Sequence, residues 1–212
     1  YPHGANTSWI TKIGYSAKHE NRIINGTIDP QGVDVDPTAK KLYFTQHYGN
    51  SISRSNYDGT DIEVLVERKG NLSFQPSDVA VDSKAKRIFA TVEGDHDAFG
   101  ALIMYDYEGK NETVLKTGLH YPYGLCVDED NQNVFYVQGG HGGSISCHSY
   151  GNTPCKVDVV ADILEYPYMC QVDSSLAKYG GPTIVLFSEA NRPGNIFFDP
   201  EYGGKSYQIP LV

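Results

Sequence analysis

Long apolar runs and helical periodicity are both missing from this chain of 212 residues. No segment approaches the ~20 consecutive apolar residues that a bilayer-spanning helix requires. No segment keeps the helical spacing of apolar residues over three turns either. The sequence therefore predicts no membrane insertion and no helical fold.

Positive charge is also scarce. Seventeen Lys and Arg stand against 26 Asp and Glu, which gives a formal net charge of −9. Because phosphates repel a surface of that sign, we expect neither nucleic acid nor an anionic membrane as a partner. Charged residues make up only 20% of the chain and apolar residues 40%, which indicates a folded domain rather than disorder.

A short phrase returns four times: a proline, then, six residues later, an aspartate that closes a valine-rich run. The copies occupy residues 30–36, 76–82, 122–128 and 167–173, and their prolines are 46, 46 and 45 residues apart. A period of about 40–50 residues is typical of an array whose unit is a four-stranded propeller blade.

Each period contains the signals of four strands. After the proline phrase comes a turn, then an aromatic-rich strand, a loop, a strand that opens on an aliphatic residue, a glycine turn and a last strand. The aromatic-rich strands are expected at 42–45, 88–91, 134–137 and 184–187, and the turn glycines are Gly59, Gly109, Gly151 and Gly203. Glycine is expected in such hairpin turns because it adopts positive φ easily. The sequence therefore predicts an all-β propeller of four-stranded antiparallel blades.

The pattern of proline, apolar run, Asp, aromatic strand and Asp-Gly turn resembles the YWTD propellers of the LDL-receptor type and, more loosely, the NHL propellers. The resemblance covers residues 28–212, and the nearest match to the signature strand is Tyr43-Phe44-Thr45-Gln46. That strand carries neither the family's tryptophan nor its closing aspartate. The resemblance implies the propeller fold.

Upstream of the four repeats, residues 10–24 align with only the outer two strands of a unit. We therefore expect residues 1–212 to form a single β-propeller domain of four complete repeats plus an N-terminal outer hairpin. Three explanations stay open: a longer chain with five or six blades when complete, completion in trans by another copy, or a small ring with an incomplete fifth blade. The start at Tyr1-Pro2, without methionine or signal peptide, is expected of a processed chain or a piece of a longer one.

Sequons and cysteines indicate an extracellular, oxidising location. Four N-glycosylation sequons begin at Asn6, Asn25, Asn71 and Asn111, each in an expected turn, loop or outer edge. Cys147 and Cys155 flank a turn, whereas Cys126 and Cys170 lie on equivalent inner strands with side chains on opposite faces. Of the three possible connectivities we favour 126–170 with 147–155. A zinc site is the competing reading, but no Cys-x-x-Cys spacing exists.

The loops between the second and third strands are the candidate functional region. They share a face with the residues that lead into the first strands, and three of them carry a histidine: His47, His96 and His141. These imidazoles either converge on an axial metal or are solvated loop histidines. Asp95 and Asp97 could bind calcium, or they belong to an acidic loop. The four aspartates that close the proline phrases are expected to cap turns.

Three functions remain possible. The first is a secreted glycoprotein module that binds a protein or glycan through its loop face, by aromatic anchors and polar partners. The proposed binding residues are His47, Tyr48, Phe74, His96, Phe99, Tyr121, His141, Tyr166 and Arg192. The second is a structural subunit of an extracellular assembly, and the third is a metal-dependent propeller hydrolase or lactonase. Because no catalytic motif is recognisable, we predict no catalytic residue and no cofactor, and leave the question of enzymatic activity open.

Overall fold

The computed structural model describes residues 8–14, 20–69, 74–94, 100–155, 159–173, 184–189, 195–199 and 207–210. Within these ranges, side chains are not described for 141, 159–163, 165, 184, 189, 195–199 and 207–210. Every regular element in the described ranges is a β-strand. The same ranges contain no helix that is long and apolar enough to cross a membrane.

The described residues contain eighteen strands, which form one two-stranded and four four-stranded sheets. The N-terminal hairpin consists of β1 (Ser8–Ile13) and β2 (Glu20–Thr27). Blade 1 comprises β3 (Val33–Asp36), β4 (Lys41–Gln46), β5 (Ser51–Asn56) and β6 (Glu63–Glu67). Blade 2 comprises β7 (Gln75–Asp82), β8 (Arg87–Glu93), β9 (Gly100–Asp106) and β10 (Thr113–Leu119). Blade 3 comprises β11 (Pro122–Asp128), β12 (Asn133–Gln138), β13 (His141–Ser149) and β14 (Val159–Glu165). Blade 4 comprises β15 (Pro167–Asp173), β16 (Ile184–Glu189), β17 (Asn195–Asp199) and β18 (Tyr207–Pro210).

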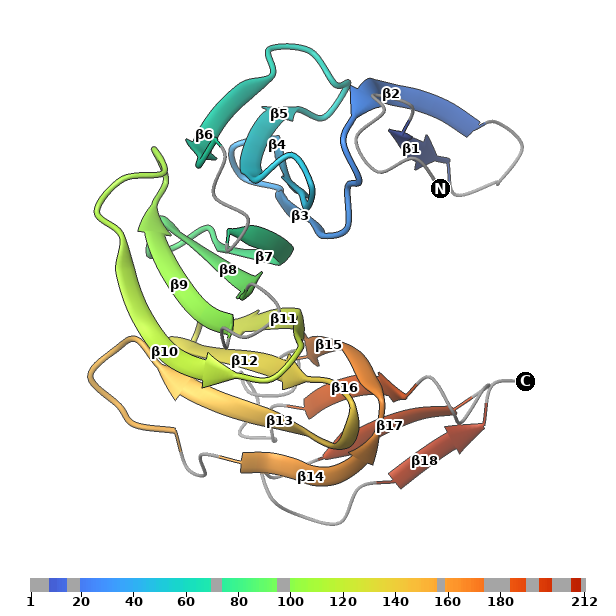
Figure 1. The fold of residues 1–212 in the computed structure, drawn as a ribbon, viewed down its shortest axis with the longest axis vertical. Helices are drawn as coiled ribbons and strands as arrows, with labels where there is room; N and C mark the ends of the chain where they lie inside the picture. The colour runs from blue at the N-terminus through green and yellow to red at the C-terminus, as the bar shows by residue number, and fades with distance from the viewer. Residues whose placement is uncertain are drawn as a thin grey trace.

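Each blade is an antiparallel meander in which strands pair in chain order. The blades follow one another along an arc, with the first strand of each blade toward the hub and the last strand at the rim (Figure 1). Neighbouring inner strands contact each other in succession, β3 with β7, β7 with β11 and β11 with β15. The prediction of an all-β propeller with four complete repeats and an N-terminal hairpin is confirmed.

The hydrophobic core lies between the blades. Aliphatic and aromatic side chains from facing sheets form one cluster at each blade junction, as expected when half-buried strands alternate their side chains between two faces. Phe44, Phe89 and Phe135 of the second strands are almost fully buried. A smaller cluster joins the hairpin to blade 1, where Ile24 packs against Leu42 and Phe44.

Three of the four aspartates that close the inner strands cap the following turns, as predicted; the turn after the fourth, Asp173, lies outside the described residues. One carboxylate oxygen of Asp36 accepts hydrogen bonds from the Thr38 and Ala39 amides, at 2.8 and 2.9 Å. Asp82 and Asp128 accept equivalent bonds from the amides two and three residues later. The buried carboxylates are therefore structural, because turn amides satisfy them.

Two of these aspartates each accept a hydrogen bond from a tyrosine of the next blade. The Tyr107 hydroxyl donates to Asp36 Oδ2 at 2.9 Å, and the Tyr150 hydroxyl donates to Asp82 Oδ2 at 2.6 Å. Burial disfavours the charged carboxylate, but the bonds from the Ala39 amide and the Tyr107 hydroxyl outweigh it and lower the pKa of Asp36. Each of these hydrogen bonds joins the outer part of one blade to the inner strand of the blade before it.

Two further carboxylates join the inner strands directly. Asp34 Oδ2 accepts the Val81 amide and Asp78 Oδ2 accepts the Leu125 amide, each at 2.8 Å. Adjacent inner strands approach so closely that a Cβ at Gly124 would lie 2.6 Å from the Met169 Cα. Glycine at that position therefore permits the contact between β11 and β15.

Both predicted disulfides are present. Cys126 of β11 is bonded to Cys170 of β15, which links the inner strands of blades 3 and 4. Cys147 of β13 is bonded to Cys155 across the turn that follows. The blade 3–blade 4 junction is thus covalent, whereas Asp34 and Asp78 serve the two earlier junctions.

The expectation for the turn glycines is met at two positions and wrong at a third. Gly59 and Gly109 have φ of 83° and 69°, as their hairpin turns require. Gly151 is not among the residues with positive φ. A side chain there would collide instead with Gln132, so close approach explains this glycine. Gly203 lies outside the described residues.

Candidate functional site

The loop face of the arc is formed by the residue before each inner-strand proline and by the loop that joins the second and third strands. In blade 1 the His47 amide donates to the Asp29 carbonyl at 2.9 Å, and in blade 3 the Gly139 amide donates to the Tyr121 carbonyl at 2.9 Å. These bonds hold the two segments together in blades 1 and 3. Residues far apart in sequence therefore share one surface, as the repeat pattern predicts.

Four tyrosines and a methionine gather on the loop face of blades 3 and 4. The Tyr123 and Tyr168 rings stack with centroids 4.8 Å apart and an interplanar angle of 18°. Tyr121 and Tyr168 are 63% and 53% exposed, and Tyr166 and Met169 are exposed as well. The Tyr166 amide donates to the Gly140 carbonyl of blade 3 at 3.3 Å, so the two blades meet here. We call Tyr121, Tyr123, Tyr166 and Tyr168 the tyrosine patch.

The backbone turn before the proline supports this patch. Tyr121 and Tyr166 have φ of 44° and 53°, in the left-handed region that bulky residues rarely adopt. Asp29, which holds the same place in blade 1, has φ of 49°. The turn thus recurs in blades 1, 3 and 4, whereas Gln75 of blade 2 does not have positive φ, and what distinguishes blades 3 and 4 is the tyrosine placed on the turn.

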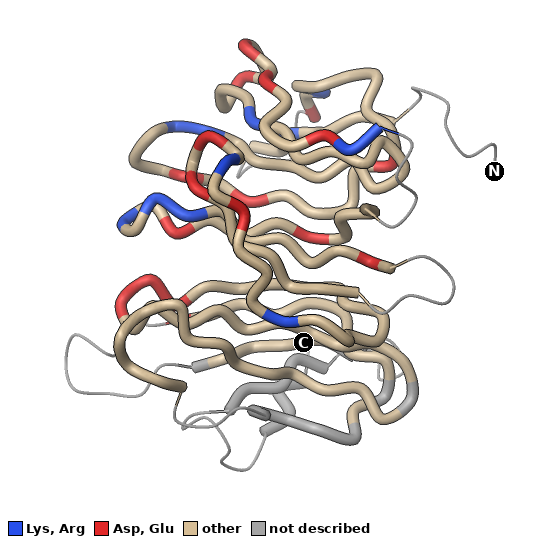
Figure 2. Tube along the Cα trace, turned by 60° about the vertical axis from the view of Figure 1, so that its left-hand side comes forward, with Lys and Arg blue, Asp and Glu red and all other residues tan. Residues whose placement is uncertain are grey.

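Tyr121 and Tyr123, the blade 3 members of the patch, lie in a part of the chain with little charge. No Lys or Arg occurs between Lys116 and Lys156, and the only acidic residues there are Asp128, Glu129 and Asp130. Figure 2 shows charged residues concentrated over the N-terminal blades, whereas strands β12 and β13 of blade 3 carry no Lys, Arg, Asp or Glu. Burial raises the pKa of Tyr123, so the stacked phenol is uncharged at neutral pH. Aromatic enrichment with few charges is characteristic of the central part of a protein interface.

His47 is buried, which corrects its assignment as an exposed polar partner. Its side chain is 5% exposed, and its Nδ1 and Nε2 lie 3.5 Å from Asp29 Oδ2 and Glu93 Oε2. Neither ring nitrogen makes a hydrogen bond. The ring contacts Tyr48 edge to face, with centroids 4.7 Å apart. His47 therefore fills the interior beneath the loop face rather than presenting a polar group on it.

Phe74 is also buried, so its assignment as an exposed anchor is wrong. The ring is 1% exposed and belongs to the cluster between blades 1 and 2. The Arg68 guanidinium lies over it, 4.7 Å from the ring centroid. An aromatic ring just before an inner strand folds into the junction because apolar burial there is more favourable than exposure.

The remaining predicted binding residues divide into two groups. Tyr48, Tyr121 and Tyr166 are exposed on the loop face. His96, Phe99 and Arg192 lie outside the described residues, as do Asp95, Asp97 and the sequon residues Asn6 and Asn71. His141 begins β13, but its side chain is not described. The described side chains contain no group of three or more His, Cys, Asp or Glu residues arranged to hold a metal ion.

Sequence reasoning missed three members of this surface: Tyr123, Tyr168 and Met169. A signal for two of them was present. The tripeptide Tyr-Pro-Tyr occurs at 121–123 and again at 166–168, where repeats 1 and 2 have Gln31 and Ser77 after the proline. Because the tripeptide begins two inner strands that are neighbours, its tyrosines come together.

No family model matches this chain. It is similar in structure to a chain of a nidogen/laminin complex, with a TM-score of 0.75, 17% identity, and coverage of 93% of this chain and 70% of that one. A gluconolactonase from Xanthomonas campestris has a TM-score of 0.73 and 17% identity over 97% of this chain and 70% of its own. TolB from Acinetobacter baumannii has a TM-score of 0.71 and 10% identity over 95% of this chain and 48% of its own. At these identities the similarity establishes the β-propeller fold.

Proposed function

We propose that this chain is an extracellular, N-glycosylated propeller module that binds a protein partner through the tyrosine patch on its loop face. The observation that carries the proposal is the exposure of Tyr121, Tyr166 and Tyr168 together on the loop face of blades 3 and 4. Tyrosine supplies a large apolar area and a polar hydroxyl, and exposed tyrosines are common binding hot spots.

The covalent chemistry of the chain supports the extracellular part of the proposal. Two disulfides close among the described residues, where no cysteine remains free, and such bonds persist in oxidising compartments. Asn25 lies on β2 and Asn111 in the β9–β10 turn, and both are exposed. Strand β2 and the β9–β10 turn both lie away from the inner strands β11 and β15 (Figure 1), so glycans there would leave the patch accessible.

Structural similarity supports a protein partner without identifying one. One similar chain was crystallised in a nidogen/laminin complex, and another is a gluconolactonase. The fold accommodates both binding and catalysis, so the choice depends on the site. The described surface offers aromatic anchors, which favour binding. A glycan is the alternative partner, because exposed tyrosines also stack on sugar rings.

The test is a binding screen followed by a matched mutant comparison. The chain, secreted from eukaryotic cells, is probed against arrays of purified extracellular proteins and of glycans, and hits are quantified by surface plasmon resonance. We expect a protein hit whose affinity falls at least ~10-fold in Tyr121→Ala/Tyr168→Ala, since two hot-spot residues commonly contribute that much. The control is Ile62→Ala/Val114→Ala, which truncates side chains of similar exposure outside the inner strands and should bind normally.

Two results would contradict the proposal. One is a protein hit that binds the tyrosine variant as tightly as the original chain while the Ile62/Val114 variant loses affinity, which would move the interface to the outer strands. The other is binding confined to glycans, which would replace the partner class. Unchanged thermal unfolding of both variants shows that any loss reflects the surface and not the fold.

A further inference from the structure

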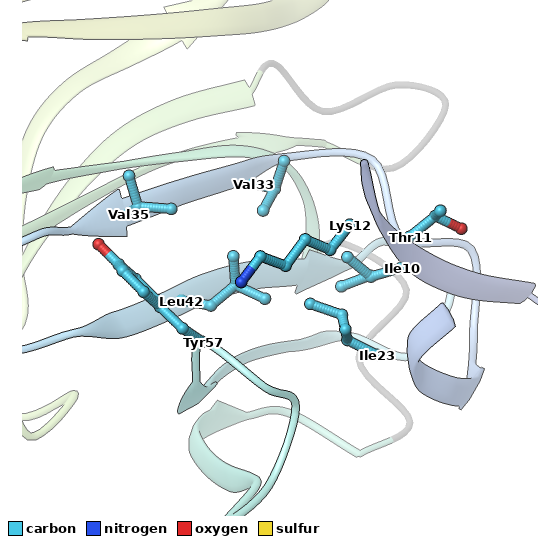
Figure 3. A pocket seen from close by; sticks show the side chains of 8 residues that line it. All are labelled: Ile10, Thr11, Lys12, Ile23, Val33, Val35, Leu42 and Tyr57. Carbon is cyan, nitrogen blue, oxygen red and sulfur yellow. The ribbon is translucent and has the colours of Figure 1, made fainter. Parts of the chain in front are cut away.

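An apolar pocket of about 400 Å³ separates the N-terminal hairpin from blade 1 (Figure 3). The hairpin contributes Ile10 and Ile23 to its lining, and blade 1 contributes Val33, Val35 and Leu42. The pocket continues the contact already made between the hairpin and blade 1, where Ile24 is buried against Leu42.

The next repeat shows what covers the surface equivalent to that formed by Val33 and Val35. Val33 and Val35 occupy the positions that Val79 and Val81 hold one repeat later. Val79 and Val81 are 2% and 6% exposed because they pack against blade 1, whereas Val33 and Val35 are 54% and 47% exposed. The hairpin covers the second strand of blade 1, but no described element covers the face of the inner strand β3 that carries Val33 and Val35. The exposed surface of Val33 and Val35 is therefore the one against which the inner strand pair of a neighbouring blade would pack.

The Tyr57 hydroxyl, at the same pocket, indicates which residue should end the missing inner strand. Tyr57 lines the pocket and holds the position of Tyr107 and Tyr150, whose hydroxyls donate to Asp36 and Asp82 of the preceding inner strand. No described residue accepts a hydrogen bond from the Tyr57 hydroxyl, which Figure 3 shows beside Val35. The Lys12 side chain extends across the pocket and adds a positive charge. An aspartate would complement both groups.

We propose that this pocket is the docking site for an antiparallel β-strand pair that belongs to polypeptide outside the described residues. In that pair the inner strand alternates aliphatic side chains and ends in an aspartate that accepts the Tyr57 hydroxyl. The pair completes the hairpin to a four-stranded blade by adding to the free edge of β1, which pairs only with β2. Backbone bonds to β1 and apolar contacts with Val33 and Val35 together give affinity and register.

A second copy of the chain does not meet this description. The sixteen strands of blades 1–4 are already paired in four-stranded sheets, and the hairpin has outer strands alone. A copy would have to unfold one of its own blades to lend an inner pair. The occupant is therefore a strand pair beyond the eighteen described strands.

The chain itself supplies a probe of the right chemistry. A fluorescent peptide of residues 75–93 spans β7 and β8. Its first strand carries alternating aliphatic side chains and ends in Asp82. A disulfide between cysteines added at its ends keeps the two strands in register. Its binding to the intact chain is measured by fluorescence anisotropy. We expect saturable binding that weakens at least ~10-fold in Val35→Lys, which places a charge on the apolar wall.

Two controls separate docking from non-specific adhesion. Val114→Lys alters a valine of similar exposure (50%) on the rim strand β10 and should leave binding unchanged. Tyr57→Phe and the peptide change Asp82→Ala should each weaken binding, and Tyr57→Phe should cause no further loss with the Asp82→Ala peptide, because that peptide lacks the acceptor of the Tyr57 hydrogen bond.

Three results would overturn the proposal. Absence of saturable binding shows that the pocket takes no strand pair, and equal binding by Val35→Lys places the peptide elsewhere. Sedimentation that reveals self-association of the chain, abolished by Val35→Lys, would assign the pocket to a second copy. Each is measured on variants whose thermal unfolding matches that of the original chain, so misfolding does not produce them.

Discussion

At the hub, single carboxylates link the inner strands of blades 1, 2 and 3 by hydrogen bonds. Asp34 and Asp78 each accept an amide of the next inner strand, although acidic residues are costly to bury. Burial dominates at Asp78: it outweighs the bonds from the Leu125 and Val79 amides and raises the pKa to about 7. This junction therefore depends on pH.

The pH dependence has a defined sign. A carboxyl group whose pKa is raised on folding binds its proton more tightly in the folded state, so its contribution is full below the unfolded pKa of 3.8 and is lost as pH rises through about 7. We expect the free energy of unfolding in urea to fall by ~2 kcal/mol between about pH 5.5 and about pH 8.5 on account of Asp78.

Two variants test that expectation. In Asp78→Asn, which cannot ionise, this part of the slope should disappear, whereas Asp58→Asn changes an exposed carboxyl whose pKa is lowered and should retain it. An Asp78→Asn variant with the same slope as the original chain would show that the group does not titrate in this range.

Residue-level errors in the sequence analysis have a common physical origin. Phe74 and His47 were expected on the surface because each adjoins an expected loop, yet both are buried. Periodicity identifies strands, but the direction of a loop side chain depends on the volume available between blades. The tyrosine patch, in contrast, was partly foreseen through Tyr121 and Tyr166, and the Tyr-Pro-Tyr tripeptides would have added Tyr123 and Tyr168.

At the level of elements, the junctions differ in chemistry. Blades 1 to 3 are joined by carboxylates and by Thr45 and Thr91, whose hydroxyls donate to carbonyls of the next inner strand. Blades 3 and 4 are joined by the Cys126–Cys170 disulfide and by the Tyr123–Tyr168 stack. The tyrosine patch is thus built on the one described junction that is covalently closed, which limits the conformational freedom of its side chains before binding.

The two disulfides should contribute unequally to stability. Cys126–Cys170 spans 44 residues and Cys147–Cys155 spans 8. Loop-closure entropy gives about 4 kcal/mol for the longer loop and about 2.5 kcal/mol for the shorter one. We therefore expect Cys126→Ala/Cys170→Ala to lower the free energy of unfolding by ~1.5 kcal/mol more than Cys147→Ala/Cys155→Ala.

Urea unfolding monitored by tyrosine fluorescence measures this difference, with the shorter-loop variant as the matched control. Equal losses, or a larger loss for the short loop, would mean that native contacts rather than loop closure set the contribution of these bonds.

Strand order and blade number could be predicted from the sequence because the repeat carries them. The spacing of the prolines places each inner strand, and the parity of Cys126 and Cys170 relative to their closing aspartates places them on facing sides of neighbouring blades. The inter-blade bonds of Asp34, Asp78 and Tyr107 could not be foreseen, since they depend on the distance and rotation between sheets.

At the scale of the whole molecule, the arc has two distinct ends (Figure 1). One end carries the hairpin and the exposed wall of β3, and the other carries blade 4, where Tyr168 and Met169 of the inner strand are exposed. Inner strands in the middle of the arc, β7 and β11, are largely buried because a blade covers each side. An inner strand is therefore exposed where no blade stacks against it and buried where a blade lies on each side.

Disulfide mapping tests the face-to-face stacking of successive repeats around one hub most directly. Chymotryptic cleavage of the unreduced protein at Tyr136, Tyr150 and Tyr168 separates the four cysteines, and mass spectrometry identifies the linked fragments. Stacked blades predict that Cys126 is linked to Cys170 and Cys147 to Cys155. A link from Cys126 to Cys147 or Cys155 would contradict the account, because it would mean that the inner strands of blades 3 and 4 do not face each other.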